Sequence, residues 1–163
     1  MDELWAEGIA LSAQARGWVF PEQRVIFTQS YGSEPTKDDV NGLVDFFLWL
    51  EHLEGADAMP KTPPPTVVHD WRSFKSISMD VRQAFVTRRK EITTLPGKLV
   101  VAVAVNPVLR MAMRTVALAS QLVTHAVPLD LVDDPTEALV TAGATLPDPV
   151  MHLRLREAWR RKT

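Results

Sequence analysis

Hydrophobic positions along the chain fall into two alternating kinds of segment. Short apolar segments rich in β-branched and aromatic residues predict strands at Arg24 to Ser30, Thr66 to Trp71, Lys98 to Val105 and Val127 to Val132. Between the first two, apolar residues from Val40 to Leu48 recur at i, i+3, i+4, i+7 and i+8, which is helical spacing. Strands that alternate with helices predict an α/β domain, in which right-handed crossovers build a mainly parallel sheet covered by helices.

Capping residues and prolines indicate where the helices begin. A small polar residue favours the N-cap, and proline is tolerated at the first helical position, where its missing N–H costs nothing. Asp38 and Asp39 stand where negative charge suits the helix dipole. The predicted helix starts are Thr36, Ser78 (for a helix from about Met79 to Ile92), Asn106-Pro107 (for a helix through Leu122), Asp134-Pro135 and Asp148-Pro149.

The same pattern predicts how the sheet is organised. Lys98 to Val105 has no alternation, so this strand is expected to be covered on both faces. Pro128 predicts that the strand from Val127 to Val132 lies at an edge. Leu4 to Phe20 predicts a strand or hairpin arm that adds to the sheet or exchanges between chains. We therefore expect an arm (1–23), a domain with four or five strands (24–143) and a helical extension (144–163).

Composition narrows the class of protein. The 163 residues are 46% hydrophobic and 23% charged, which fits one folded domain. The absence of cysteine excludes disulfides and thiolate sites, and a net charge of −2 gives no general electrostatic case for nucleic acid or an anionic membrane. The longest apolar run is too short to span a bilayer, and the acidic start Met1-Asp2-Glu3-Leu4 does not resemble a signal peptide. A cytoplasmic protein is expected.

Residue types that carry chemistry do not gather into a catalytic motif. His69 and Asp70 could form a general acid–base pair, but adjacent strand residues point to opposite faces. Asp70 is therefore expected to cap or brace the following loop. His52, His125 and His152 have no metal-ligand spacing. Neither a phosphate-binding glycine motif nor a G-x-S-x-G motif is present. The sequence predicts no catalytic residue, metal or cofactor, and a protein that is not an enzyme.

The order of four segments resembles a known family. These segments are Val67-Val68-His69-Asp70, the helix start from Phe74 to Asp80, the apolar strand from Leu99 to Val105, and Asp133 to Leu139. Together they are similar to the STAS family and its SpoIIAA-like relatives, which resemble anti-sigma-factor antagonists, over about 24–143. The resemblance implies a SpoIIAA-like α/β sandwich and a non-catalytic role in protein–protein interaction within a bacterial signalling pathway. The implied partner is a regulatory kinase, an anti-sigma factor or another signalling protein.

The resemblance also implies where the partner binds. In the family's antagonists a partner kinase phosphorylates a serine at the start of the helix after the Asp-ending strand. Here Met79 and Asp80 stand at the serine positions, and Ser78 precedes them, so Ser78 is either a regulatory phosphosite or a simple N-cap. The residues expected to bind a partner or to regulate binding are Asp70, Trp71, Ser76, Ser78, Met79 and Asp80.

Two further readings stay open. Phe46 to Leu53 carries more aromatic surface than one core face explains. This fits either a thick core with the arm packed over it, or a partner or dimer surface, as in a homodimeric structural subunit. An apolar helix beside a sheet can also open a pocket, so a small-molecule or lipid-binding domain is the alternative function. The basic runs Arg88 to Lys90 and Arg154 to Lys162 are expected to be solvated helix ends rather than a nucleic-acid surface.

Overall fold

The structure, a computed structural model, describes residues 7–55, 58–60, 62–94, 96–103, 107–111, 113–114, 127–145 and 147–163. The elements in these ranges are β1 (Ile9–Ala10), β2 (Ala15–Phe20), β3 (Val25–Ser30), α2 (Lys37–Glu51), β4 (Thr66–Trp71), α3 (Met79–Arg89), β5 (Lys98–Val103), β6 (Leu129–Val132), α5 (Pro135–Thr141) and α6 (Pro149–Lys162). Residues 107–111 and 113–114 are also helical. Leu4, residues 104–106, His125 and the predicted helix beyond residue 114 lie outside the described residues.

The strands of the described ranges form one mixed sheet in the order β1-β2-β3-β4-β5-β6. β1, β2 and β3 pair antiparallel, and β3, β4, β5 and β6 pair parallel. The α/β prediction is confirmed, but the sheet has six strands rather than four or five. The arm supplies both extra strands, and β1 is only two residues long, too short to leave an alternation in the sequence.

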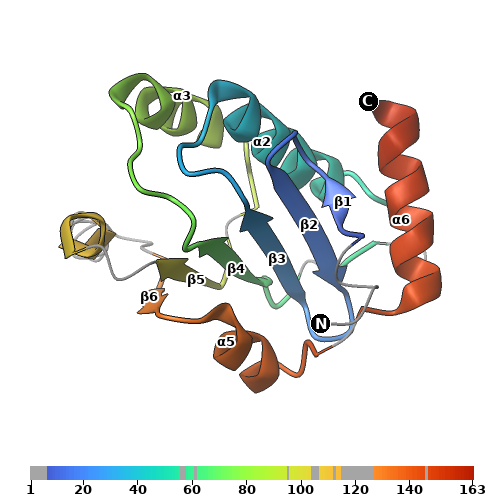
Figure 1. The fold of residues 1–163 in the computed structure, drawn as a ribbon. Helices are drawn as coiled ribbons and strands as arrows, with labels where there is room; N and C mark the ends of the chain where they lie inside the picture. Colours follow the sequence, from blue (N-terminus) through green and yellow to red (C-terminus); the bar gives the residue numbers. More distant parts are fainter. Residues whose placement is uncertain are drawn as a thin grey trace.

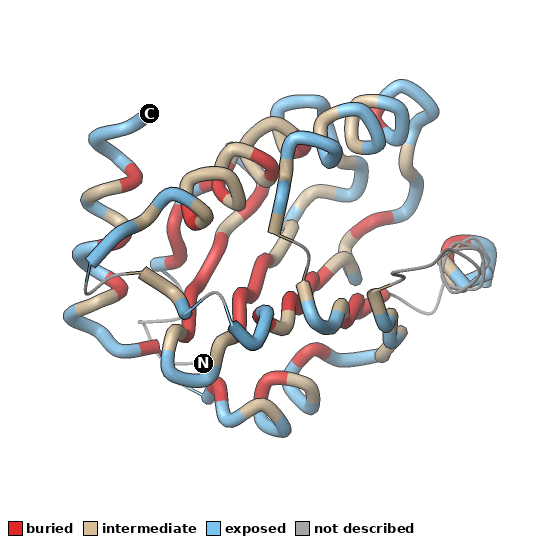
Figure 2. The backbone as a smooth tube through the Cα atoms, turned by 180° about the vertical axis from the view of Figure 1, so that it is seen from behind, coloured by how far each residue is buried: buried red, intermediate tan, exposed pale blue. Residues whose placement is uncertain are grey.

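Helices cover both faces of the sheet (Figure 1). α2 and α3 lie over one face, α5 covers the other, and α6 stands beside β1. Val19, Ile26 and Val67 belong to the core cluster on the α2 side, whereas Phe27 and Val68, one residue further along their strands, belong to the cluster that includes Leu139 of α5. Figure 2 shows the buried residues concentrated along the middle strands between these layers. The central strands are therefore apolar on both faces.

Several local predictions are confirmed. Thr36 caps α2 with a reciprocal capping box, because Thr36 Oγ1 accepts from Asp39 N (3.2 Å) and Asp39 Oδ2 accepts from Thr36 N (2.7 Å). Asp134 and Asp148 accept from the backbone N–H groups of the first turns of α5 and α6. β6 is an edge strand of the described sheet. Residues 100–103 of β5 are buried, which agrees with a strand covered on both faces.

The C-terminal helix α6 packs against aromatic residues of α2. Trp159 Nε1 donates to Ala10 O of β1 at 2.8 Å, and Arg156 forms an ion pair with Glu7. The Trp159 ring lies 5.7 Å from the ring of Phe46, which is fully buried, and 5.3 Å from that of Trp49. The aromatic residues of α2 thus pack into a thick core under α6 and the arm.

Candidate functional site

Asp70, the penultimate residue of β4, is held in a polar clamp. Its Oδ1 and Oδ2 accept from Nε and an NH2 nitrogen of Arg72, both at 2.9 Å, and Oδ2 also accepts from Gln29 Nε2 at 3.1 Å. Arg72 reaches onward to Asp134 Oδ2 at 3.2 Å, at the start of α5. The hydrogen bonding that Arg72 donates to Asp70 is the main reason that the pKa of Arg72 is raised. The expectation that Asp70 braces the loop is confirmed.

The loop from β4 to α3 is tied to the neighbouring β3–α2 loop. Ser73 Oγ donates to Ser30 O (2.6 Å), Lys75 N donates to Ser33 O (2.8 Å), and Ser76 Oγ donates to Glu34 Oε1 (2.8 Å). Phe74 is buried between these tethers. The two loops therefore form one fixed shelf at the carboxyl ends of β3 and β4.

Ser78 occupies the N-cap position of α3 but does not cap the helix. Its backbone is extended, as an N-cap requires, yet its hydroxyl donates to Asp80 Oδ1 instead of accepting from a backbone N–H. That hydrogen bond, followed by the charge of Lys37 at 3.5 Å, lowers the pKa of Asp80. The position of the cap was predicted correctly, but its hydrogen bond was not, because a carboxylate two residues on competes for the hydroxyl.

The six residues predicted from the resemblance do not form one site. Asp70 is buried on the face that α5 covers, whereas Trp71 lies on the opposite face and stacks on His69, with ring centroids 5.2 Å apart. Ser76, Ser78, Met79 and Asp80 are exposed along the shelf and the first turn of α3. The first two residues position the loop, and the last four present its surface.

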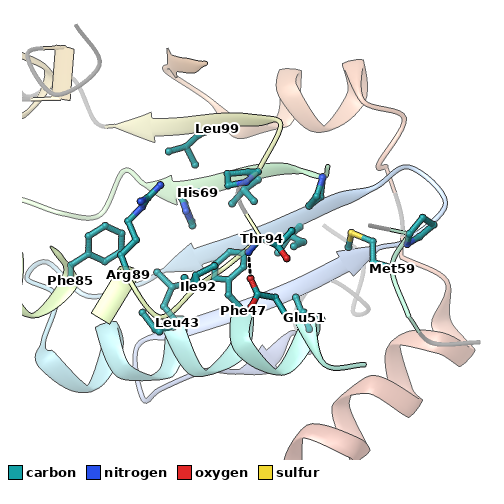
Figure 3. Close-up of a pocket in the computed structure, with 17 residues that line it drawn as sticks. Leu43, Phe47, Glu51, Met59, His69, Phe85, Arg89, Ile92, Thr94 and Leu99 are labelled. Carbon is teal, nitrogen blue, oxygen red and sulfur yellow. Dashed lines mark hydrogen bonds between the residues drawn. The ribbon is translucent and has the colours of Figure 1, made fainter. Parts of the chain in front are cut away.

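A cavity lies between the sheet and the pair α2 and α3 (Figure 3); a pocket beside an apolar helix was left open as an alternative, but the sequence did not indicate its place or its lining. Its volume is about 120 Å³, and it is partly open to solvent. The sheet supplies its floor, including His69 and Leu99, while Phe47 comes from α2 and Phe85 from α3. Arg88 helps to hold α3 in place over it, because its guanidinium donates to Asn41 and Asp45 of α2 at 3.0 and 2.9 Å.

His69 is the buried polar group of this cavity. It is 6% exposed, and burial lowers its pKa to about 4, so the imidazole is neutral at pH 7. Its Nδ1 lies 2.5 Å from Thr28 Oγ1, and Phe47 and Trp71 pack against the ring. Among the described residues, Nε2 has no hydrogen-bond partner. The clue in the sequence was a histidine on the inward face of an apolar strand, but the cavity itself depends on where α3 stands.

Two further ionisable side chains line the cavity, Glu51 and Arg89, and of these Glu51 alone forms hydrogen bonds among the described residues. Glu51 accepts from Thr94 N and from Thr93 Oγ1, the latter at 3.1 Å. Arg89 makes no hydrogen bond or ion pair within the described part of the chain. The cavity can therefore bind an apolar group with one polar end. In the described ranges no three His, Asp or Glu side chains converge as metal ligands, and no helix is long and apolar enough to cross a membrane.

Comparison with known proteins adds no relative. No family model, curated protein or solved structure matches this chain.

Proposed function

We propose that this protein is a non-catalytic, STAS-type protein–protein interaction module of a bacterial cytoplasmic signalling pathway. Support comes from the strand–helix repeat that the resemblance implies. The four parallel strands β3 to β6 lie side by side in chain order, with α2 after β3 and α3 after β4. The segment Val67 to Asp70 ends β4 and leads through the braced loop into α3, as in the SpoIIAA-like arrangement.

The observation that carries the proposal is the exposed apolar surface of α3. Met79 is 74% exposed and Val86 is 60% exposed, and a separation of seven residues sets them on one side of the helix. Charged and polar side chains surround them, Arg82 among them. Methionine and arginine are enriched at protein interfaces, where an apolar centre sits within a polar rim. We call Met79, Arg82 and Val86 the α3 surface.

The loop before α3 supports a binding role for this surface. Its three tethers to the β3–α2 loop hold the first turn of α3 in a fixed position, so little ordering entropy is lost on binding. The Ser78 hydroxyl at this turn is exposed and does not cap the helix, which makes it a candidate for modification by a regulatory kinase. A phosphate there would lie beside Asp80 and Lys37, and so would change the charge of the contact surface.

The test is a quantitative affinity capture from the native host with the wild-type protein and the M79D/V86D variant. The matched control is Val140→Asp, because Val140 is 57% exposed on α5, on the opposite face of the sheet. We expect a signalling protein that the wild type and the control retain and the α3 variant loses. If every captured protein binds all three equally, the proposal is wrong.

The partner of the α3 surface can also be a second copy of this chain. Light scattering at two protein concentrations separates this case, because a homodimer dissociates on dilution and a monomeric adaptor does not change. Loss of the dimer in M79D/V86D would assign the same surface to self-association.

A further inference from the structure

The cavity between α2, α3 and the sheet has the size and lining of a small-ligand site. An apolar cavity of about 150 Å³ in another protein binds benzene, so about 120 Å³ suits an apolar group of roughly six carbon atoms. Leu43, Phe47, Phe85 and Leu99 line it, and it is partly open to solvent. Lining of this kind, apolar with few polar groups, is typical of ligand pockets.

The polar side chains of the cavity indicate which polar group a ligand should carry. The Thr28 hydroxyl has no other partner among the described residues. Its proton is therefore hydrogen-bonded only if Thr28 donates to His69 Nδ1. The neutral ring then carries its hydrogen on Nε2, a donor on a buried side chain that has no partner among the described residues. In Figure 3 the Arg89 side chain extends from α3 towards the part of the cavity where His69 lies. One cation and one neutral donor therefore face the same space.

We propose that this cavity binds a small monocarboxylate, whose carboxylate oxygens accept from Arg89 and from His69 Nε2 and whose tail has about six carbons. A charge-assisted hydrogen bond from a guanidinium is among the strongest available to a carboxylate. A single negative charge matches Arg89, the one lysine or arginine among the described residues that line the cavity. The Glu51 carboxylate in the same lining opposes a dianion such as a phosphate ester, because like charges repel.

This site is independent of the α3 surface. The cavity lies between the helices and the sheet, and its lining does not include Met79, Arg82 or Val86. Either proposal can therefore fail without the other.

The experiment uses hexanoate as the probe and 1-hexanol as its uncharged counterpart. Titration of the full chain at pH 7 is followed by NMR of the His69 ring nitrogens and of the side chains of Phe85 and Ile92. We expect saturable hexanoate binding that shifts the His69 Nε2 resonance. Arg89→Gln should weaken hexanoate binding by about fivefold or more and leave 1-hexanol binding unchanged. The matched control is Lys90→Gln, which removes the same charge from the adjacent, exposed residue outside the cavity.

A second variant tests the location of the apolar tail. Leu99→Trp fills the cavity from β5 and should abolish binding of both probes, while a thermal melt checks that the domain stays folded. The proposal is overturned if hexanoate leaves the His69 resonances unchanged up to millimolar concentrations. It is equally overturned if Arg89→Gln and Lys90→Gln weaken hexanoate binding by the same factor, because the charge would then act only at long range.

Discussion

The ion pair between Asp70 and Arg72 predicts that removing one partner lowers the free energy of unfolding more than removing the other. The Asp70 side chain is 4% exposed, whereas that of Arg72 is 39% exposed. Removing Arg72 leaves a buried carboxylate whose donors among the described residues are Gln29 and one backbone N–H. Removing Asp70 leaves a guanidinium that water can reach. The position of each group relative to solvent, rather than the pair distance, decides the cost.

The magnitudes follow from this asymmetry. Stranding a buried charge costs about 3–5 kcal/mol, so we expect Arg72→Ala to lower the free energy of unfolding by about that amount. We expect Asp70→Ala to cost about 1–2 kcal/mol, because it loses hydrogen bonds without stranding a buried ion. In the double variant the carboxylate is gone, so D70A/R72A should be more stable than Arg72→Ala alone.

Urea unfolding at pH 7 is the assay. With a denaturant slope of about 2 kcal/mol per molar urea, the Arg72→Ala midpoint should fall by about 1.5–2.5 M. The control is Lys98→Ala, whose ion pair with Asp130 is short at 2.6 Å but about half-exposed, and which should cost at most about 1 kcal/mol. The reasoning is refuted if Arg72→Ala costs no more than Asp70→Ala, or if the double variant is the least stable of the three.

Three further predictions concern the buried histidine, the C-terminal helix and a helix contact. Because burial holds the pKa of His69 at about 4, the unfolded chain takes up a proton near pH 6.5 while the folded chain does not, so stability should fall by on the order of 3 kcal/mol as pH drops from about 6.5 to about 4. Urea unfolding across this range should show a shallower pH dependence in His69→Gln, and an unchanged slope would contradict the assignment. Trp159→Phe removes the hydrogen bond to Ala10 O and should cost about 1 kcal/mol. Hydrogen exchange should then accelerate in α6 and β1, whereas uniform acceleration would refute a local role. Gly42→Ala would normally stabilise a helix, but its Cβ would lie 2.0 Å from Leu11 O, so thermal unfolding should reveal destabilisation by about 1–3 kcal/mol or more.

Most of the helices and strands, and their order along the chain, could be predicted from the sequence. Local signals are strong where one residue sets the backbone or satisfies a helix end, as at Thr36, Asp134 and Asp148. The unbroken apolar run of β5 likewise indicated a strand covered on both faces, because only such a strand needs no polar side.

Other features were decided only by the tertiary structure. The two-residue β1 is a strand because it pairs with β2. α6 packs against β1, where Trp159 Nε1 donates to Ala10 O. Neither contact leaves a local pattern in the sequence. The Ser78 hydroxyl donates to Asp80 instead of capping α3, and this competition depends on where the two side chains lie. His69 was visible in the sequence as a polar residue in an apolar strand, but its role depends on the space that α2 and α3 leave above the sheet. A cavity is a property of packing between distant segments, so no periodicity along the chain encodes it.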